Sequence, residues 1–142
     1  MSYKLFLDDD RNPIDCIHWM HKRIGPGNFI YLEDDWVIVR NYDEFCKVIK
    51  TAGLPSFISF DHDLGKDMVA YMIDNGMSKR QARRQKKFQK SGYDCAQFLV
   101  NECIRRQMSL PRFAVHSLNP IGAENIRIFL LNAARELSKD QT

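Results

Sequence analysis

The sequence predicts an α/β fold in which helices cover both faces of a mostly parallel sheet of about four to five strands. Two observations lead to this fold class. Short apolar runs typical of buried strands recur along the chain, and segments with apolar residues at helical spacing lie between them. Crossovers between parallel strands place such helices on both faces of a sheet. With 142 residues, 44% of them hydrophobic, the chain is long enough for a core of its own, and we expect a single domain over residues 1–142.

The predicted strands are short apolar segments that end in polar residues. They cover residues 3–7, 36–40, 57–60 and 112–115. A further apolar run at residues 29–32 precedes the acidic turn 33–35, so this part of the chain forms either a hairpin or a loop followed by the strand at 36–40.

The predicted helices lie between these strands. Pro13 permits a helix start before Ile14 and Ile17, with Met20 or His21 and Ile24 continuing the apolar stripe. A short amphipathic helix follows with Phe45, Val48 and Ile49, and residues 66–90 include a possible apolar helical face made by Met68, Tyr71 and Met72.

Two helix starts carry capping signals. The stretch SGYD at residues 91–94 has the S-x-x-D form of a capping box before a stripe that includes Leu99 and Cys103. Asn119 followed by Pro120 is typical of an N-cap with proline at the first helical position, before a last helix with Ile126, Leu130 and Leu137.

Polar clusters close three of the predicted strands. They are Asp8, Asp9, Asp10 and Arg11 after the first strand, Asp61, His62 and Asp63 after the third, and His116, Ser117 and Asn119 after the fourth. In a flavodoxin-like strand order these three strands are neighbours, and ligands of such sheets bind beyond the carboxyl ends of the strands. We therefore expect the clusters to meet in one crevice.

Carboxylates brought this close together repel one another unless a cation neutralises them. The candidate metal ligands are Asp8, Asp9, Asp61 and Asp63, and oxygen ligands of this kind favour Mg²⁺ or Mn²⁺, while the nearby histidines keep Zn²⁺ or iron open. Taken singly, each acidic stretch could instead be a solvated loop with helix-capping aspartates. His62 and His116 each follow a strand and could act as metal ligands or in acid–base chemistry.

The net charge of +3 is unevenly distributed. Seven cations and no acid occur within the twelve residues 79–90, which leaves 14 of the 21 cations against all 18 acids elsewhere. This basic segment could contact the phosphates of RNA, or it could be a solvated helix face or loop. Its cations are Lys79, Arg80, Arg83, Arg84, Lys86, Lys87 and Lys90.

The four cysteines and the hydropathy pattern indicate a reducing, cytoplasmic environment. Cys16, Cys46, Cys95 and Cys103 form no CxxC pair and lie in or beside apolar patterns, so they are interpreted as small core residues rather than as zinc ligands or disulfides. No signal peptide is evident, and no window approaches the roughly 18 apolar residues of a membrane span.

Four stretches resemble a known family: FLDDDRNP, FDHDLG, SGYD and VHSLNPIGAENI. Over about residues 4–129 they resemble the cyclic-phosphate processing receiver domain family, which looks like a derivative of the response-regulator receiver fold. The resemblance implies a receiver-like domain in which Asp8, Asp9 and Asp61 hold Mg²⁺. It also implies that about residues 66–90 are an insertion, because SGYD follows DHDLG more closely in the family.

The resemblance also suggests roles for the remaining polar residues. Arg11, Ser117 and Asn119 would bind the phosphate, and Asp61, His62 and His116 would be catalytic, with His116 protonating the leaving ribose oxygen. The predicted activity is metal-dependent opening of a cyclic phosphate, such as a 2′,3′-cyclic phosphate on a nucleotide or an RNA end.

Two other classes of function remain open. In ordinary receivers the third-strand aspartate, here Asp61, accepts a phosphoryl group, and Ser117 fits the hydroxyl position after the fourth strand. We expect no fifth strand with a terminal lysine, which such a switch uses, after the last predicted helix. The third class is a module that binds a nucleotide or RNA without chemistry.

Overall fold

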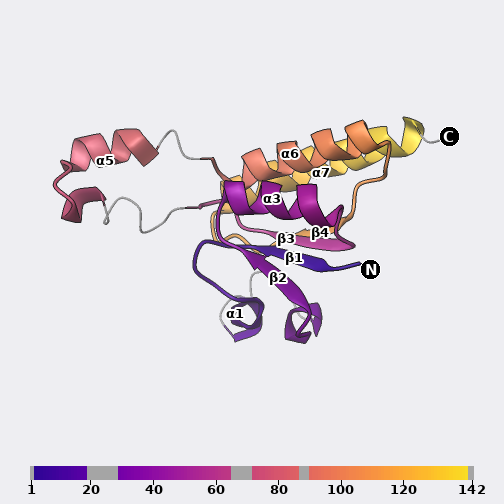
Figure 1. Cartoon of the computed structure of the whole chain (residues 1–142), viewed down its shortest axis with the longest axis horizontal. Helices are drawn as coiled ribbons and strands as arrows, with labels where there is room; N and C mark the ends of the chain where they lie inside the picture. The colour runs from indigo at the N-terminus through magenta and orange to yellow at the C-terminus, as the bar shows by residue number, and fades with distance from the viewer. Residues whose placement is uncertain (1, 19–28, 65–71, 87–89, 141–142) are drawn as a thin grey trace.

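The computed structural model describes residues 2–18, 29–64, 72–86 and 90–140 and confirms the predicted α/β fold (Figure 1). Its strands are all parallel and lie in the order β2-β1-β3-β4. They are β1 (Lys4–Leu7), β2 (Trp36–Val39), β3 (Phe57–Phe60) and β4 (Arg112–Val115). Because β1, β3 and β4 are neighbours, the polar residues that follow them share one edge of the sheet, as the flavodoxin-like order predicts.

Helices cover both faces of this sheet. In Figure 1, α3, α6 and α7 lie on one face, while α1 and the 3-10 helix η1 lie on the other. The helical elements are α1 (Pro13–His18), η1 (Phe29–Leu32), α3 (Tyr42–Ala52), α5 (Lys79–Lys86), α6 (Gly92–Arg106) and α7 (Pro120–Asp140).

The two faces of the sheet bury different cores because successive strand residues point in opposite directions. Leu5 and Leu7 join the larger core beneath α3, α6 and α7. Phe6, between them, joins a smaller core with Cys16 and Tyr31 under α1 and η1. All of these side chains are at most 2% exposed, so β1 is buried on both faces and its carboxyl end is firmly positioned.

The predicted capping signals are confirmed. The Ser91 hydroxyl accepts a hydrogen bond from the backbone N–H of Tyr93, and the Asp94 carboxylate accepts one from the N–H of Ser91, which completes a capping box at the start of α6. The Asn119 side chain accepts a hydrogen bond from the N–H of Gly122 and so caps α7. Both helices therefore start at fixed points close to the sheet edge.

The structure overturns one of the structures predicted from the sequence, and several predicted helical positions fall on residues that it does not describe. The hairpin that residues 29–32 could have formed with β2 is wrong, since Phe29–Leu32 is the 3-10 helix η1. Its Tyr31 hydroxyl lies 2.7 Å from the Ser59 hydroxyl, and this buried contact holds the segment under the sheet. The helical positions predicted at 20, 21 and 24, and those at 68 and 71, fall in segments that the structure does not describe.

Two predictions about the whole chain can be compared with this fold. All four cysteines, at positions 16, 46, 95 and 103, are free and buried, which confirms that they are core residues. Among the helices that the structure describes, none combines the length and apolarity needed to cross a bilayer.

Candidate functional site

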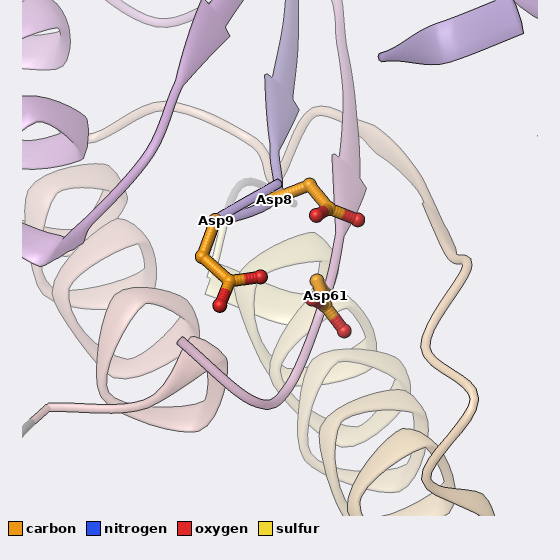
Figure 2. Close-up of side chains that lie close together, drawn as sticks. All are labelled: Asp8, Asp9 and Asp61. Atoms are coloured by element: carbon orange, nitrogen blue, oxygen red, sulfur yellow. The ribbon is translucent and has the colours of Figure 1, made fainter. Parts of the chain in front are cut away.

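Three carboxylates meet where β1 and β3 end (Figure 2). One oxygen each from Asp8, Asp9 and Asp61 lies within 4.8 Å of the others. Leu7 and Phe60 are register partners, and the Asp61 N–H donates to the Leu7 carbonyl over 3.0 Å, so the residues after the two strands are adjacent. Asp8 and Asp61 are buried, with Asp9 half-buried at the opening.

The Asp8 carboxylate is held by three hydrogen bonds. Its Oδ1 accepts from the backbone N–H groups of Asp10 and Arg11 at 2.9 and 2.8 Å, and its Oδ2 lies 3.0 Å from Nε2 of His116. Burial raises the pKa of Asp8, but these hydrogen bonds outweigh burial and bring the pKa to about 2. Asp8 is therefore ionised and fixed in orientation.

Asp61 has the opposite electrostatic environment. Burial raises its pKa first, and the negative charges of Asp8 and Asp9 raise it further, against hydrogen bonds from the His62 N–H and the Ser117 hydroxyl, to about 7. The three carboxylates thus repel one another in a poorly solvated place. A set of oxygen ligands with this excess of negative charge fits a divalent cation such as Mg²⁺ or Mn²⁺.

His116 lies behind Asp8 and is fully buried. Its ring stacks on Phe6 with centroids 4.4 Å apart, and its Nδ1 is 2.6 Å from the Ser59 hydroxyl, which in turn contacts Tyr31. Burial lowers the pKa of His116 despite the opposing effect of Asp8. Hydrogen-bond matching then assigns a neutral ring in which Nε2–H donates to Asp8 and Nδ1 accepts from Ser59.

His62 makes a similar pair with Asp63 at the surface. Its Nδ1 is 2.8 Å from Asp63 Oδ1, and its side chain is 23% exposed. Asn119 donates from its amide to both oxygens of Asp63 at 3.3 and 3.4 Å. His62 also lines an open groove, so a ligand can reach its side chain.

Two glycines allow the helices to approach the residues after β3. A Cβ on Gly92 would lie 1.7 Å from the carbonyl oxygen of Asp61, and a Cβ on Gly122 would lie 2.3 Å from the His62 ring. The Gly92 N–H also donates to the His62 carbonyl over 2.8 Å. A larger residue at Gly92 would push α6 away from the site, and one at Gly122 would displace the His62 ring or α7.

Beside the acidic cluster lies a small cavity of about 170 Å³. Its walls combine negative, positive and hydroxyl groups: Asp9, Asp10, Arg11, Asp61, Asp63, Ser117 and Leu118. The Arg11 guanidinium lies 3.8 Å from Asp8 Oδ2, with its side chain 16% exposed. The cavity therefore joins the acidic cluster to a cation and a hydroxyl that suit a phosphate group.

Arg40 is a site residue that the sequence analysis missed. It follows β2 and donates from Nη1 to the carbonyls of Asp8 and Arg11, at 3.2 and 2.5 Å, and from Nη2 to the Asn12 side chain at 2.6 Å. These bonds fix the loop that carries the acidic cluster. The signal available in the sequence was that Arg40 stands at the end of the strand beside β1, as the acidic residues stand at the ends of β1 and β3.

The structure brings together most predicted site residues, and their chemical roles remain predictions. Asp63 lies next to the acidic cluster but outside it, because His62 and Asn119 bind its carboxylate. His116 touches the cluster only through Asp8, and among described residues it does not line the small cavity.

The basic segment lies apart from this site. In Figure 1, α5 stands away from the sheet on the side opposite the N-terminus. The carboxyl ends of the strands point to this side. Lys79, Arg80, Arg83 and Arg84 are exposed on it. Lys90 lies nearer the body of the protein, with its ammonium 4.8 Å from the Tyr42 ring centroid. Lys87 and the Lys86 side chain fall outside the described residues.

Comparison with known proteins gives one result. The family model of the cyclic-phosphate processing Receiver domain matches residues 3–132, which is most of the chain. No curated protein and no solved structure gives a match.

Proposed function

This chain belongs to the cyclic-phosphate processing receiver domain family, and from that premise we propose that it hydrolyses a cyclic phosphate on a nucleotide or an RNA end. The observation that carries the proposal is the small cavity where the acidic cluster, Arg11 and Ser117 meet. Its size and mixed charge suit a phosphate group. The preferred substrate is a 2′,3′-cyclic phosphate, whose strained five-membered ring favours opening.

The acidic cluster would hold the cofactor, Mg²⁺ or Mn²⁺. Asp8, Asp9 and Asp61 would supply the oxygen ligands. The raised pKa of Asp61 reflects burial first and then repulsion by Asp8 and Asp9, which a cation would relieve. When bound, the cation would polarise the phosphodiester and make a water molecule more acidic. Asp63 was also predicted as a ligand, but its contacts with His62 and Asn119 support a positioning role instead.

The chain's own side chains would bind the phosphate. The Arg11 guanidinium can donate to two phosphate oxygens. The Ser117 hydroxyl, which donates to Asp61 in this structure, would rotate to donate to a third oxygen when the phosphate is bound. Asn119 was predicted to touch the phosphate, yet its amide group already bonds Asp63 and the Gly122 N–H. We assign Asn119 to holding the Asp63 carboxylate in place.

In this proposal His62 transfers the proton. During hydrolysis the attacking water would give a proton to Nε2 of His62 as its oxygen bonds to phosphorus, one ring P–O ester bond breaks, and the released ribose oxygen takes that proton from Nε2 to leave a phosphate monoester. With Nδ1–H donating to Asp63, the Nε2 of His62 is available to carry that proton. His116 is sealed from solvent and both of its nitrogens are engaged, so its proposed role is to orient Asp8.

The exposed cations of α5 would contact a polynucleotide that carries the cyclic end. Four basic side chains on one short helix form an electrostatic surface for phosphates, and such binding weakens steeply with salt. Changing Lys79, Arg80, Arg83 and Arg84 to Gln should weaken RNA binding and flatten its salt dependence while sparing mononucleotide turnover. Equal losses on both substrates would rule out the polynucleotide role.

The central experiment is a turnover assay on purified protein. Nucleoside 2′,3′-cyclic phosphates and RNA ending in the same group are supplied with Mg²⁺, Mn²⁺ or Zn²⁺ singly, and the monoester product is measured. Asp61→Asn is the matched inactive variant, because it keeps the side-chain shape and the oxygen that accepts from the His62 N–H. A folded protein that turns over neither substrate with any metal would refute the proposal.

A second candidate is a receiver-type switch in which Asp61 is phosphorylated. It is favoured by the position of Asp61 at the end of β3 and by the Ser117 hydroxyl beside it. Among the described residues β4 is the last strand, so they contain no lysine at the end of a fifth strand. A stable beryllofluoride adduct at Asp61 would support the switch. Tight nucleotide binding that survives metal removal, without turnover, would instead indicate a binding module.

A further inference from the structure

A second hollow lies next to the small cavity, between the start of α6 and the first half of α7. It is an open groove of about 570 Å³. Its walls are His62, Ser91 and Tyr93 on one side and Asn125, Ile128, Phe129 and Asn132 of α7 on the other. We propose that this groove binds the nucleobase and ribose of a nucleotide whose phosphate lies in the small cavity. This inference rests on the proposed function. It adds where the base and ribose of the substrate would bind, which the phosphate site does not specify.

His62 connects the two hollows. It lines the groove, while its Nδ1 bonds Asp63, which lines the small cavity. Its ring packs against Gly122 in the first turn of α7, so the helix runs from the phosphate cavity along the groove. At about 1.5 Å per residue, Asn125 lies about 4.5 Å and Phe129 about 10 Å along the axis from Gly122. Asn125 and Phe129 therefore lie about one and two helical turns beyond the Gly122 that packs on His62, in the order expected for the ribose and the base of one nucleotide.

The chemistry of the groove differs from that of the cavity. Four of the seven residues lining the small cavity are acids and one is Arg11, whereas no Asp, Glu, Lys or Arg occurs among the described residues that line the groove. A nucleotide has the same division, with a charged phosphate and an uncharged base. The adjacent hollows match the two ends of one such molecule.

The groove also offers the two kinds of contact that bases use. The rings of Tyr93 and Phe129 are 5.2 Å apart and tilted by 50°, both half-buried, and Ile128 beside them is 50% exposed. Aromatic and apolar side chains of this kind stack on the faces of bases. Asn125 is exposed, and its amide can donate and accept at once, as the mixed edge of a base requires.

The test compares substrates with and without a base. Turnover is measured on nucleoside 2′,3′-cyclic phosphates and on glycerol 1,2-cyclic phosphate, which has the same ring and no base. We expect a KM at least about tenfold lower for the nucleotides. Tyr93→Leu should remove most of that advantage, Tyr93→Phe should keep it, and Asn125→Ala should change the preference among bases. None of these variants should alter the KM for the glycerol compound.

Two controls separate this inference from the proposed hydrolysis. Asn101→Ala, at an exposed position on α6 outside the groove, should leave every KM unchanged. Binding of nucleoside 3′-monophosphates, measured by calorimetry, needs no turnover. Binding that Tyr93→Leu weakens, in a protein that opens no cyclic phosphate, would support the groove and reject the hydrolysis. Equal KM values with and without a base, or equal effects of Tyr93→Leu on both substrates, would overturn the groove.

Discussion

Two histidine–aspartate pairs occur at the site, one that includes Asp8 of the acidic cluster and one beside the cluster, and they differ in their access to water. The His116–Asp8 pair is fully buried, and both ring nitrogens of His116 have partners. The His62–Asp63 pair is at the surface, and His62 lines an open groove. The same two residue types thus suit different tasks, because burial makes one pair a rigid support while exposure leaves the other able to exchange protons.

The largest expected effect is on the exposed pair. His62→Gln should lower kcat on a nucleoside 2′,3′-cyclic phosphate by about 10²- to 10⁴-fold, the usual contribution of a general acid or base. Metal-induced thermal stabilisation should be unchanged, since Asp8, Asp9 and Asp61 remain. The assay is steady-state kinetics with a melting curve with and without Mg²⁺. A variant that keeps its rate would remove His62 from the chemistry.

Asp61, between the two pairs, gives the next largest effect through pH. Its folded pKa of about 7 lies above the ordinary value of 3.8, so the stability that its proton supplies is present below pH 3.8 and is lost as pH rises to about 7. In metal-free protein Asp61→Asn should therefore gain about 2–3 kcal/mol over the wild type between pH 5 and pH 8, at about 1.36 kcal/mol per unit. Urea unfolding of both proteins at each pH measures this difference.

Magnesium provides the matching control for that measurement. At pH 8 Mg²⁺ should stabilise the wild type and have little effect on Asp61→Asn, whereas Asp34→Asn, an exposed acid away from the cluster, should respond like the wild type. At this pH Asp8, whose pKa is about 2, is ionised, so its own titration does not enter the comparison. Equal stabilisation of all three proteins would show that Mg²⁺ does not bind at the cluster.

The buried pair should act on metal affinity. His116→Gln should weaken Mg²⁺ or Mn²⁺ binding by about 10- to 100-fold, as is usual for a residue that orients a metal ligand, and excess metal should restore most of kcat. A catalytic acid would behave differently, since metal cannot replace its proton. Titrating activity against metal concentration therefore separates the two roles of His116.

The sequence predicted the sheet edge well because strand ends depend on local chemistry. The bounds of β3 and β4 follow from apolar runs that stop at Asp61 and His116, and the parallel order then brings distant acids together. The separation of the two histidines was not predictable from local patterns, since both follow a strand and stand beside polar groups. Their difference arises from Phe6 and Ser59, which come from other strands and face the buried ring.

One signal for the burial of His116 was nevertheless present. Ser59 interrupts the otherwise apolar strand Phe57–Phe60, and a buried hydroxyl needs a hydrogen-bond partner. Residues 59 and 114 are register partners, so position 116 lies two residues further on the same face. The contact with Tyr31 could not be inferred this way, because it depends on how η1 folds back beneath the sheet.

The smallest expected effects concern the hydrogen bonds that run from Asp8 through His116 and Ser59 to Tyr31. Ser59→Ala leaves both the Tyr31 hydroxyl and Nδ1 of His116 without their partner, which should cost about 1–3 kcal/mol of unfolding free energy. Tyr31→Phe removes only the outermost hydroxyl, and Ser59 can still donate to His116, so its cost should be about 1 kcal/mol or less. Urea denaturation measures both, and metal affinity should fall in the same order. If Tyr31→Phe costs more than Ser59→Ala, the support does not run from Tyr31 through Ser59 and His116 to Asp8, and the buried pair loses its assigned task.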